Sequence, residues 1–429
     1  MKQPKVETIK LDKIVGGGQA LGVLKSGKKA FVWGGLPGET VEARLTKKKS
    51  SYAEAVVEQV IEPSPQRIEP KDEAYLSTSP WQIMDFDAEQ HYKSALIEEA
   101  FELHDIVLPG PITVFSDNQT YNYRNKIEFS FWWDNEEEQL DLAFFRRGTK
   151  GKIPVDGTSL ARPEINQLAI AVRDLLRAKK VEARDLKTLM IRSSQADRVV
   201  FQLYVKDEKC QPLAEADFKA LPAIGGQVIY SDPKSPASKV TRVLASFGQT
   251  KLTDKLLDHE FGYVVNGFFQ VNLPVYEQAL MDMKNYLSDR PLVDLYAGVG
   301  SIGLSIGPSG TTLVEVDEFA VKEMKNNIEA SGSKATAVLA ASEQALDYIT
   351  TDKDVIVDPP RAGLHKKVIE RLLEVKPPRI IYLSCNPVTQ ARDVALLAES
   401  YGIRAHQGYN FFPRTPHIEH LVVLDLKAL

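Results

Sequence analysis

From residue 261 to residue 429, short apolar segments alternate with amphipathic helical patterns. The segments PLVDLYA, TTLVEVD, DVIVDPP and RIIYLSC are typical of strands, whereas FAVKEMKNNIEA and KKVIERLLE are typical of helices. Buried strands that alternate with helices predict a mostly parallel sheet with helices on both faces. Ligands of such folds bind at the carboxyl ends of the strands. We therefore expect a doubly wound α/β domain over 261–429 with its site at that edge.

The two preceding regions have different patterns. Residues 1–65 contain short β-rich segments such as KAFVWG and YAEAVVEQVIE, separated by glycine-containing turns, which predicts a small OB-like β-barrel. Residues 66–260 open with the helical pattern EQHYKSALIEEAFELH and continue with strand-like segments such as YRNKIEFSFWW and VVFQLYV. This order indicates a mixed α/β central domain. The whole chain is thus expected to be an α/β protein of three domains.

Composition narrows the class of protein. No stretch approaches the roughly 18 uncharged apolar residues that a membrane span needs, and the N-terminus lacks an apolar signal core. We therefore expect a cytoplasmic protein without a membrane partner, and we expect a monomer. Cys210 and Cys385 are the only cysteines, and the seven histidines lack zinc-ligand spacing. We expect no metal.

Positive charge gathers near the N-terminus although the chain as a whole carries −5. Residues 1–60 hold 11 Lys or Arg against 6 Asp or Glu, a local charge of +5. Lys47, Lys48 and Lys49 with Tyr52 suit a phosphate- and base-binding surface, and a solvated charge run fits the triplet equally well. A second basic and aromatic group in the central region suits single-stranded RNA; it comprises Tyr123, Arg124, Lys126, Phe144, Phe145, Arg146, Arg147, Lys150 and Lys152.

A glycine-rich turn follows the strand LVDLY. Residues 298–303 match G-x-G-x-x-G, a motif shared by nicotinamide, flavin and S-adenosylmethionine binders. Asp294 at the strand end would repel a pyrophosphate but suits a cationic amino-acid ligand. Glu315, at the end of the next strand, can accept both hydroxyls of a ribose. Asp317 is a rival for that role, or it caps the following helix.

Cys385 lies between a buried strand and a helix. Asn386 is a candidate N-cap and Pro387 suits the first helical turn. The positive end of the helix should favour the thiolate of Cys385. The alternative is a small buried hydrophobic residue.

Two further groups suggest what such a thiolate would do. Asp358 opens the segment Asp-Pro-Pro-Arg at another strand end, where paired prolines stiffen the backbone around a planar ligand. Addition of a thiolate to carbon 6 of uracil makes carbon 5 nucleophilic, and a base must then remove the carbon 5 proton. Glu419, before the strand LVVLDL, is the candidate base. His417 and His420 are rival bases, although His417 fits an orienting role better.

These segments together resemble the RNA uracil-C5 methyltransferase family. FFQVN, DLYAGVGSIGL, VEVD, VDPPRAGL, YLSCNP and TPHIEH occur in that family's order and spacing and cover the last 170 residues. The resemblance implies a Rossmann-like catalytic domain that binds S-adenosylmethionine through Gln270, Tyr296, Glu315 and Asp358. It also implies that Cys385 is the nucleophile and Glu419 the base. The helix near 90–118 would pack on the catalytic domain.

The N-terminal barrel is similar to the TRAM domain of that family, an RNA-binding module. Many members with this barrel hold an iron-sulfur cluster on four cysteines. The matching stretch LSTSPWQIM contains none, so we expect no cluster. The barrel favours 23S ribosomal RNA as the substrate, and transfer RNA is the alternative.

Three other functions fit parts of the pattern. A methyltransferase acting on base amines would use Asp358 without needing Cys385 or Glu419. A non-catalytic RNA-binding protein would keep only a relic of the cofactor site. A nicotinamide oxidoreductase would leave Cys385 and Glu419 unexplained.

Overall fold

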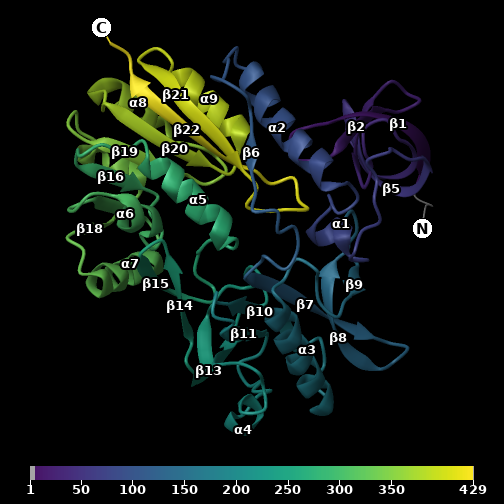
Figure 1. The fold of residues 1–429 in the computed structure, drawn as a ribbon. Coiled ribbons are helices and arrows are strands. Elements are labelled where there is room, and N and C mark those ends of the chain that lie inside the picture. The colour runs from purple at the N-terminus through teal and green to yellow at the C-terminus, as the bar shows by residue number, and fades with distance from the viewer. Residues whose placement is uncertain (1–4, 429) are drawn as a thin grey trace. The chain divides into compact units, whose positions relative to one another are not determined.

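The computed structural model describes residues 5–428, and its contacts divide the chain into two compact units (Figure 1). The first unit contains residues up to Tyr92, Gln119–Leu252 and Pro413–Pro416, and the second contains Lys93–Asn118, Thr253–Phe412 and the residues from His417 onward. The expected division into domains at 65 and 260 stays a prediction.

The first unit begins with a closed five-stranded barrel in the strand order β1-β2-β3-β5-β4. Buried and exposed side chains alternate along its strands. The buried side chains fill the interior of the barrel and include Ile9, Leu11, Val32 and Val41. This barrel confirms the fold predicted for the N-terminal region. Its strands are β1 (Val6–Ile14), β2 (Ala20–Val23), β3 (Lys29–Trp33), β4 (Thr40–Lys48) and β5 (Tyr52–Glu62).

A seven-stranded sheet forms the rest of the first unit, in the order β13-β12-β11-β10-β7-β8-β9. Its inner strand β11 is buried along its whole length, and helix α3 packs on the sheet through Ile165, Leu168 and Val172. The elements are α1 (Tyr75–Thr78), β7 (Lys126–Asp134), β8 (Gln139–Phe145), β9 (Lys152–Pro154), α3 (Pro163–Ala178), β10 (Leu186–Ser193), β11 (Val199–Val205), α4 (Glu215–Phe218), β12 (Gly225–Tyr230) and β13 (Arg242–Gly248).

The second unit is built on an eight-stranded sheet in the order β18-β17-β16-β19-β20-β22-β21-β6. Strands β16 to β20 are parallel, and β22 runs antiparallel between β20 and β21. The predicted doubly wound domain is confirmed. Its strands are β6 (Val114–Phe115), β16 (Leu292–Leu295), β17 (Thr312–Glu315), β18 (Thr336–Leu339), β19 (Asp354–Val357), β20 (Arg379–Ser384), β21 (Tyr401–Tyr409) and β22 (Glu419–Leu426).

Helices connect the strands of this sheet, and α8 packs beside α9 (Figure 1). Some of them begin at a side-chain cap: Asn386 caps α9, and Asp317 caps α7 by accepting a hydrogen bond from the amide of Ala320 at 2.8 Å. The remaining elements are α5 (Leu273–Lys284), α6 (Ser301–Ile306), α7 (Glu318–Ser331), two 3₁₀ turns (Ser342–Gln344 and Leu346–Tyr348), α8 (Lys366–Val375), α9 (Pro387–Leu397) and the hairpin of β14 (Lys251–Leu256) and β15 (His259–Val264).

The helix expected near 90–118 is shorter than predicted. Helix α2 spans Phe86–Glu102, and the chain then runs through irregular backbone to β6, which pairs with β21. Asp105 has a left-handed φ of 56°, and Pro109 and Pro111 lack the amide hydrogen that a helix continued to 118 would need. In the part of the chain that the structure describes, no helix is long and apolar enough to cross a membrane.

Candidate active site

The glycine-rich turn lies between β16 and α6. Gly298 and Gly300 have positive φ angles of 56° and 85°, a region that side chains with a Cβ rarely adopt. A Cβ on Gly300 would approach Leu304 and Leu313 to 3.0 and 3.2 Å, whereas space beyond Gly298 is open. The turn therefore leaves room for a ligand beside Gly298 while its other end packs tightly on the domain.

Asp294 has a different role from the one suggested by its position. Its carboxylate is fully buried and accepts a hydrogen bond from the amide of Gly303 at 2.9 Å. Burial raises its pKa to about 8, because a charged carboxylate loses its hydration there. The interpretation of Asp294 as a direct partner for a cationic ligand is therefore wrong. Its carboxylate is buried and instead binds the amide of Gly303 in α6.

Glu315 ends β17 and reaches back to the glycine-rich turn. One carboxylate oxygen accepts from the amide of Gly298 at 2.9 Å, and the other accepts from the amides of Val316 and Asp317, each at 2.8 Å. These bonds fix the orientation of a carboxylate at the strand end. The carboxylate oxygen that accepts from Gly298 has a second acceptor position, so a hydroxyl donor of a ligand can still bind there. The side chain of Asp317 is used as the helix cap instead.

Two more residues implied by the family resemblance lie in loops of the second unit. Tyr296 follows β16 with a φ of 65°, and its hydroxyl accepts a hydrogen bond from Ser342 at 2.8 Å. Gln270 is buried and lies between β15 and α5 rather than in a strand. Near it on α5, the buried Tyr276 shares a 2.8 Å hydrogen bond with Ser301, at the start of α6.

Cys385 and Glu419 meet at the end of the strand pair β20 and β22. The last pair in that antiparallel ladder is Ser384 with His420, so the next position along it sets Cys385 opposite Glu419. The side chain of Asn386 accepts from the amide of Val388 at 3.2 Å and so caps α9 directly after the cysteine. The structure thus brings together two residues that are 34 positions apart in the sequence.

The expectation that helix α9 would favour the thiolate is wrong for this state of the protein. The pKa of Cys385 is raised to about 11. Burial is the main cause, and the negative charges of Glu419 and Asp358 add to it, whereas the positive charge of Arg361 opposes it. Loss of hydration and two carboxylates outweigh the partial charge of a helix end.

Both carboxyl groups beside Cys385 also hold their protons more tightly than usual. Burial raises the pKa of Asp358 to about 7. The pKa of Glu419 is raised well above its ordinary value by burial and then by the charge of Asp358, while Arg361 again opposes the shift. The group of Cys385, Asp358 and Glu419 therefore binds protons readily, and Arg361 is the cation that acts against this.

Arg361 is held by two elements. Its guanidinium lies 2.8 Å from the Nδ1 atom of His417, and its backbone carbonyl accepts from Asn386 at 2.9 Å and from Thr389 at 3.1 Å. This supports the orienting role expected for His417. His420 lies on the other face of β22 from Glu419, because neighbouring side chains alternate along a strand, so it is not placed as a rival base. No local pattern indicates the contact between Arg361 and His417, because the two residues are 56 positions apart.

The basic and aromatic group of the central region is only partly available to a ligand. Tyr123 is buried and donates to the carbonyl of Pro413 at 3.1 Å, and the Phe144 ring stacks on Phe129. Tyr123 is therefore not exposed to a ligand, and Phe144 is partly buried against the core of the sheet. Phe145 is 61% exposed, and the Lys152 ammonium lies 5.0 Å from the centre of its ring.

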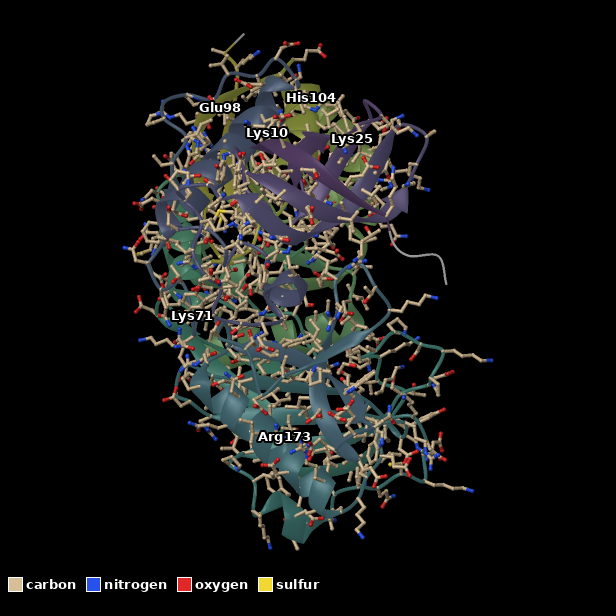
Figure 2. The ribbon with its side chains drawn as sticks, turned by 90° about the vertical axis from the view of Figure 1, so that its right-hand side faces the viewer. Lys10, Lys25, Lys71, Glu98, His104 and Arg173 are labelled. Atoms are coloured by element: carbon tan, nitrogen blue, oxygen red, sulfur yellow. The ribbon has the colours of Figure 1, made fainter. Side chains whose placement is uncertain are left out.

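The barrel carries its cations on the outside. Lys10 and Lys25 project from its surface (Figure 2), and Lys48 and Lys49 are exposed at the end of β4. Lys47 instead forms a 3.0 Å ion pair with Glu54. The triplet is thus divided between one paired and two exposed lysines.

In the stretch LSTSPWQIM, ordinary hydrogen bonds fix the polar side chains. Gln82 donates to Ser79 at 2.6 Å and accepts from the amide of Lys71 at 2.8 Å, and Trp81 donates to the carbonyl of Gly18 at 3.0 Å. Within residues 5–428, no cluster of three or more His, Cys, Asp or Glu side chains could hold a metal ion. The absence of an iron-sulfur cluster stays a prediction.

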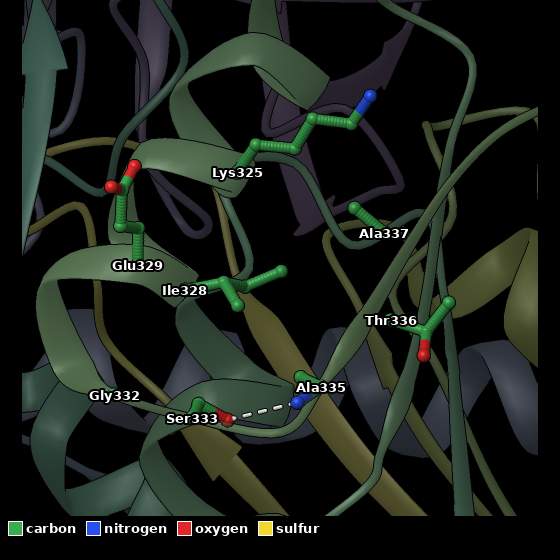
Figure 3. Close-up of a pocket in the computed structure, with 8 residues that line it drawn as sticks. All are labelled: Lys325, Ile328, Glu329, Gly332, Ser333, Ala335, Thr336 and Ala337. Carbon is green, nitrogen blue, oxygen red and sulfur yellow. Dashed lines mark hydrogen bonds between the residues drawn. The ribbon is translucent and has the colours of Figure 1, made fainter.

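A shallow pocket at the end of α7 and the start of β18 contains none of the predicted site residues (Figure 3). Lys325, Ile328, Glu329 and Ala337 are among the residues that line it, and Ser333 accepts from the amide of Ala335 at 3.1 Å. Its lining offers no group placed for the chemistry considered above.

Comparisons with known proteins agree with this geometry. Residues 345–427 match the family model "tRNA (Uracil-5-)-methyltransferase". An uncharacterized RNA methyltransferase of Lactobacillus johnsonii is 31% identical, covering 95% of this chain and 96% of the relative, and one of Enterococcus faecalis is 29% identical, covering 92% of each.

A solved structure has the same fold. The tRNA (uracil-54, C5)-methyltransferase of Pyrococcus abyssi, in complex with S-adenosyl-L-homocysteine, superimposes with a TM-score of 0.80 at 20% identity, covering 97% of this chain and all of that one. The sequence matches cover nearly the whole chain, and the family model matches the segment that contains both Cys385 and Glu419. The chain belongs to the RNA uracil-C5 methyltransferase family.

Proposed function

We propose that this protein uses S-adenosylmethionine to methylate carbon 5 of a uridine in RNA, with Cys385 as the nucleophile and Glu419 as the base. One observation carries the proposal: the register of β20 and β22 sets these two residues opposite each other at the edge of the sheet where ligands bind. A methyltransferase acting on base amines has no use for that pair. The family membership supports the same reaction.

The cofactor site that we propose consists of Gln270, Tyr296, Glu315 and Asp358. The open space beside Gly298 and the fixed carboxylate of Glu315 fit a nucleoside whose ribose hydroxyls donate to that carboxylate. When bound, S-adenosylmethionine supplies a methyl group on a positively charged sulfur. The carboxylate of Asp358 beside it suits that charge.

The residues of the chain then perform four linked events. The Cys385 thiol loses its proton to water and its sulfur bonds to carbon 6 of the uracil, whose carbon 5 gains the electron pair of the former double bond. With that pair carbon 5 would take the methyl group, and the cofactor sulfur would keep the electrons of the broken carbon–sulfur bond and lose its positive charge. Glu419 removes the hydrogen at carbon 5 as a proton. The electrons of the broken C–H bond restore the double bond, and the sulfur leaves as the Cys385 thiolate.

The raised pKa values of Cys385 and Glu419 mean that both groups must lose their protons before they can react. Cys385 must release a proton and Glu419 must be able to accept one, although burial favours the neutral form of each. Arg361 lowers the pKa of both groups. We infer that binding of a substrate lets Arg361 and the cofactor charge act on a site closed to water, where such interactions are stronger.

Ribosomal and transfer RNA are the two candidate substrates. The barrel favours 23S ribosomal RNA, whereas the matching family model and the Pyrococcus enzyme are named for transfer RNA. The experiment is to incubate the purified full chain with S-adenosylmethionine and either RNA lacking modifications, and to map 5-methyluridine by mass spectrometry. Formation of 5-methyluridine in one RNA is expected. Methylated adenine or guanine in its place would overturn the proposal.

The base can be tested separately with RNA containing 5-fluorouridine. Fluorine cannot leave as a proton, so wild-type protein should stall as a covalent adduct that survives a denaturing gel. Glu419→Gln should give a similar adduct with ordinary RNA, because addition and methylation precede proton removal. Normal turnover by Glu419→Gln would exclude Glu419 as the base.

A further inference from the structure

Behind the candidate nucleophile and base lies a buried side chain that contacts both of their strands. Gln390 is on the first turns of α9, five residues after Cys385, and its side chain is fully buried. Its amide nitrogen donates to the carbonyl of Tyr382 at 3.0 Å and to the carbonyl of His420 at 2.9 Å. One amide group therefore joins helix α9 to β20 and to β22.

The orientation of this amide is fixed by its partners. Carbonyl oxygens can only accept, so the end of Gln390 that faces Tyr382 and His420 must be the NH₂ group. The oxygen then faces the Nδ1 atom of His420 at 2.7 Å, which must carry the proton and donate. All the hydrogen-bonding atoms of the Gln390 side chain are thus used in a single arrangement.

His420 is itself held by aromatic neighbours. Its Nε2 atom lies 3.2 Å from Nδ1 of His406 on β21, and the Phe101 ring packs edge-on against it with the ring centres 5.3 Å apart. Burial lowers the pKa of His420 well below its ordinary value, which keeps the ring neutral. A neutral imidazole with Nδ1 as donor is what the contact with Gln390 requires.

Each bonded carbonyl is close in sequence to a residue of the proposed chemistry. His420 directly follows Glu419 on β22, and Tyr382 precedes Cys385 by three residues on β20. Gln390 therefore ties α9, which begins directly after the nucleophile, to the strand of the base. We propose that Gln390 is a positioning residue that sets the distance and orientation between the Cys385 sulfur and the Glu419 carboxylate. This inference rests on the proposed function.

Substitution of Gln390 by Met tests the role, because Met keeps the volume but removes the hydrogen bonds. A misplacement of reacting groups by about 1 Å can cost about 100-fold in rate. We therefore expect kcat for 5-methyluridine formation to fall at least tenfold, while KM for RNA and for S-adenosylmethionine changes less than about twofold. Formation of the 5-fluorouridine adduct, which needs Cys385 but not proton removal, should fall less than overall turnover.

A double variant separates positioning from simple loss of stability. Gln390→Met leaves the His420 ring with an unsatisfied buried donor, whereas Gln390→Met with His420→Leu removes both polar partners and should recover much of the lost thermal stability. Recovery of Tm with kcat still low supports positioning. Recovery of Tm and kcat together would show that Gln390 only stabilises the fold and would overturn the inference.

The matched control is Gln202→Met. Gln202 is a buried glutamine on β11 that donates to Gln227 at 2.9 Å and accepts from Tyr204 at 2.8 Å. The Gln202→Met variant should lose stability without a change in kcat.

Gln390→Asn keeps the amide group but has a shorter side chain, so it tests the positioning role of Gln390 if the Met variants do not fold. Wild type and Cys385→Ala run alongside: an inactive wild type refutes the proposed function, whereas an active wild type with normal kcat in the Gln390 variants refutes only the inference.

Discussion

The barrel and the edge of the eight-stranded sheet hold their ionisable side chains in opposite environments. Lys48 and Lys49 are exposed to water on the barrel, where salt screens each charge. Asp358 and Cys385 are partly buried and Glu419 is buried; the three lie close together, and the pKa of each is raised. Exposed charge suits contact with a polyanion, whereas buried groups suit the storage and transfer of protons.

This difference predicts how strongly a substitution in each region affects RNA binding or catalysis. Removing one exposed cation should weaken binding slightly, because many similar charges share the contact. Removing one buried reactive group should stop a chemical step, because no neighbour can replace it. The following tests run from the largest expected effect to the smallest.

Replacement of Cys385 by Ala should abolish 5-methyluridine formation, by a factor of at least about 1,000, since the proposed addition to carbon 6 needs a thiol at this position. Cys210→Ala is the matched control, because Cys210 packs against the core of the seven-stranded sheet, and it should keep wild-type activity. The measurement is 5-methyluridine per enzyme by mass spectrometry. Substantial methylation by Cys385→Ala would mean that no covalent adduct is needed.

The alkylation rate of the partly buried Cys385 thiol should rise steeply with pH. A pKa raised to about 11 means that the thiolate fraction of Cys385 rises tenfold with each unit between pH 7 and pH 9. In the Cys210→Ala background, alkylation by iodoacetamide should therefore accelerate about 100-fold over that range. Glu419→Gln removes a charge that raises this pKa, so it should react faster than its parent at equal pH. An alkylation rate that stops rising below pH 8 would contradict the raised pKa of Cys385.

The barrel should show the smallest effects. Lys48→Ala and Lys49→Ala should each weaken RNA binding by only a few-fold at moderate salt, and each should reduce the slope of log affinity against log salt by about 0.7 to 0.9. Lys179→Ala is the control, because that lysine is paired with Asp217. Filter binding at several salt concentrations measures the slope. Unchanged slopes in both barrel variants would remove these lysines from the RNA contact.

Local signals made much of the fold predictable. The alternation of strands and helices from residue 261 onward anticipated the parallel part of the sheet, and the cap at Asn386 was readable because its bond reaches only to Val388. The carboxyl-edge position of Glu315 followed from the same pattern.

Properties that depend on distant partners could not be read in this way. The raised pKa of Cys385 comes from Glu419 and from burial, neither of which its flanking residues reveal. The buried state of Tyr123 depends on Pro413, 290 residues away. Gln390 resembles any polar helical residue until His420 is placed beside it, so the sequence alone gave no reason to single it out.

The alternation along β22 has a consequence for how this protein can change over evolution. Glu419 points to the side of Cys385 and His420 to the side of Gln390 because neighbouring side chains alternate between the two faces of a strand. The pairing of β22 with β20 on one edge and with β21 on the other fixes its register. A shift of the strand by one residue would exchange an acid for an imidazole opposite the thiol and bury a carboxyl group against an amide oxygen. The loop before β22 can accommodate an insertion without a change of register. A shift of β22 by an odd number of residues would move every side chain to the other face, so the residue that lies opposite Cys385 depends on the register of this strand.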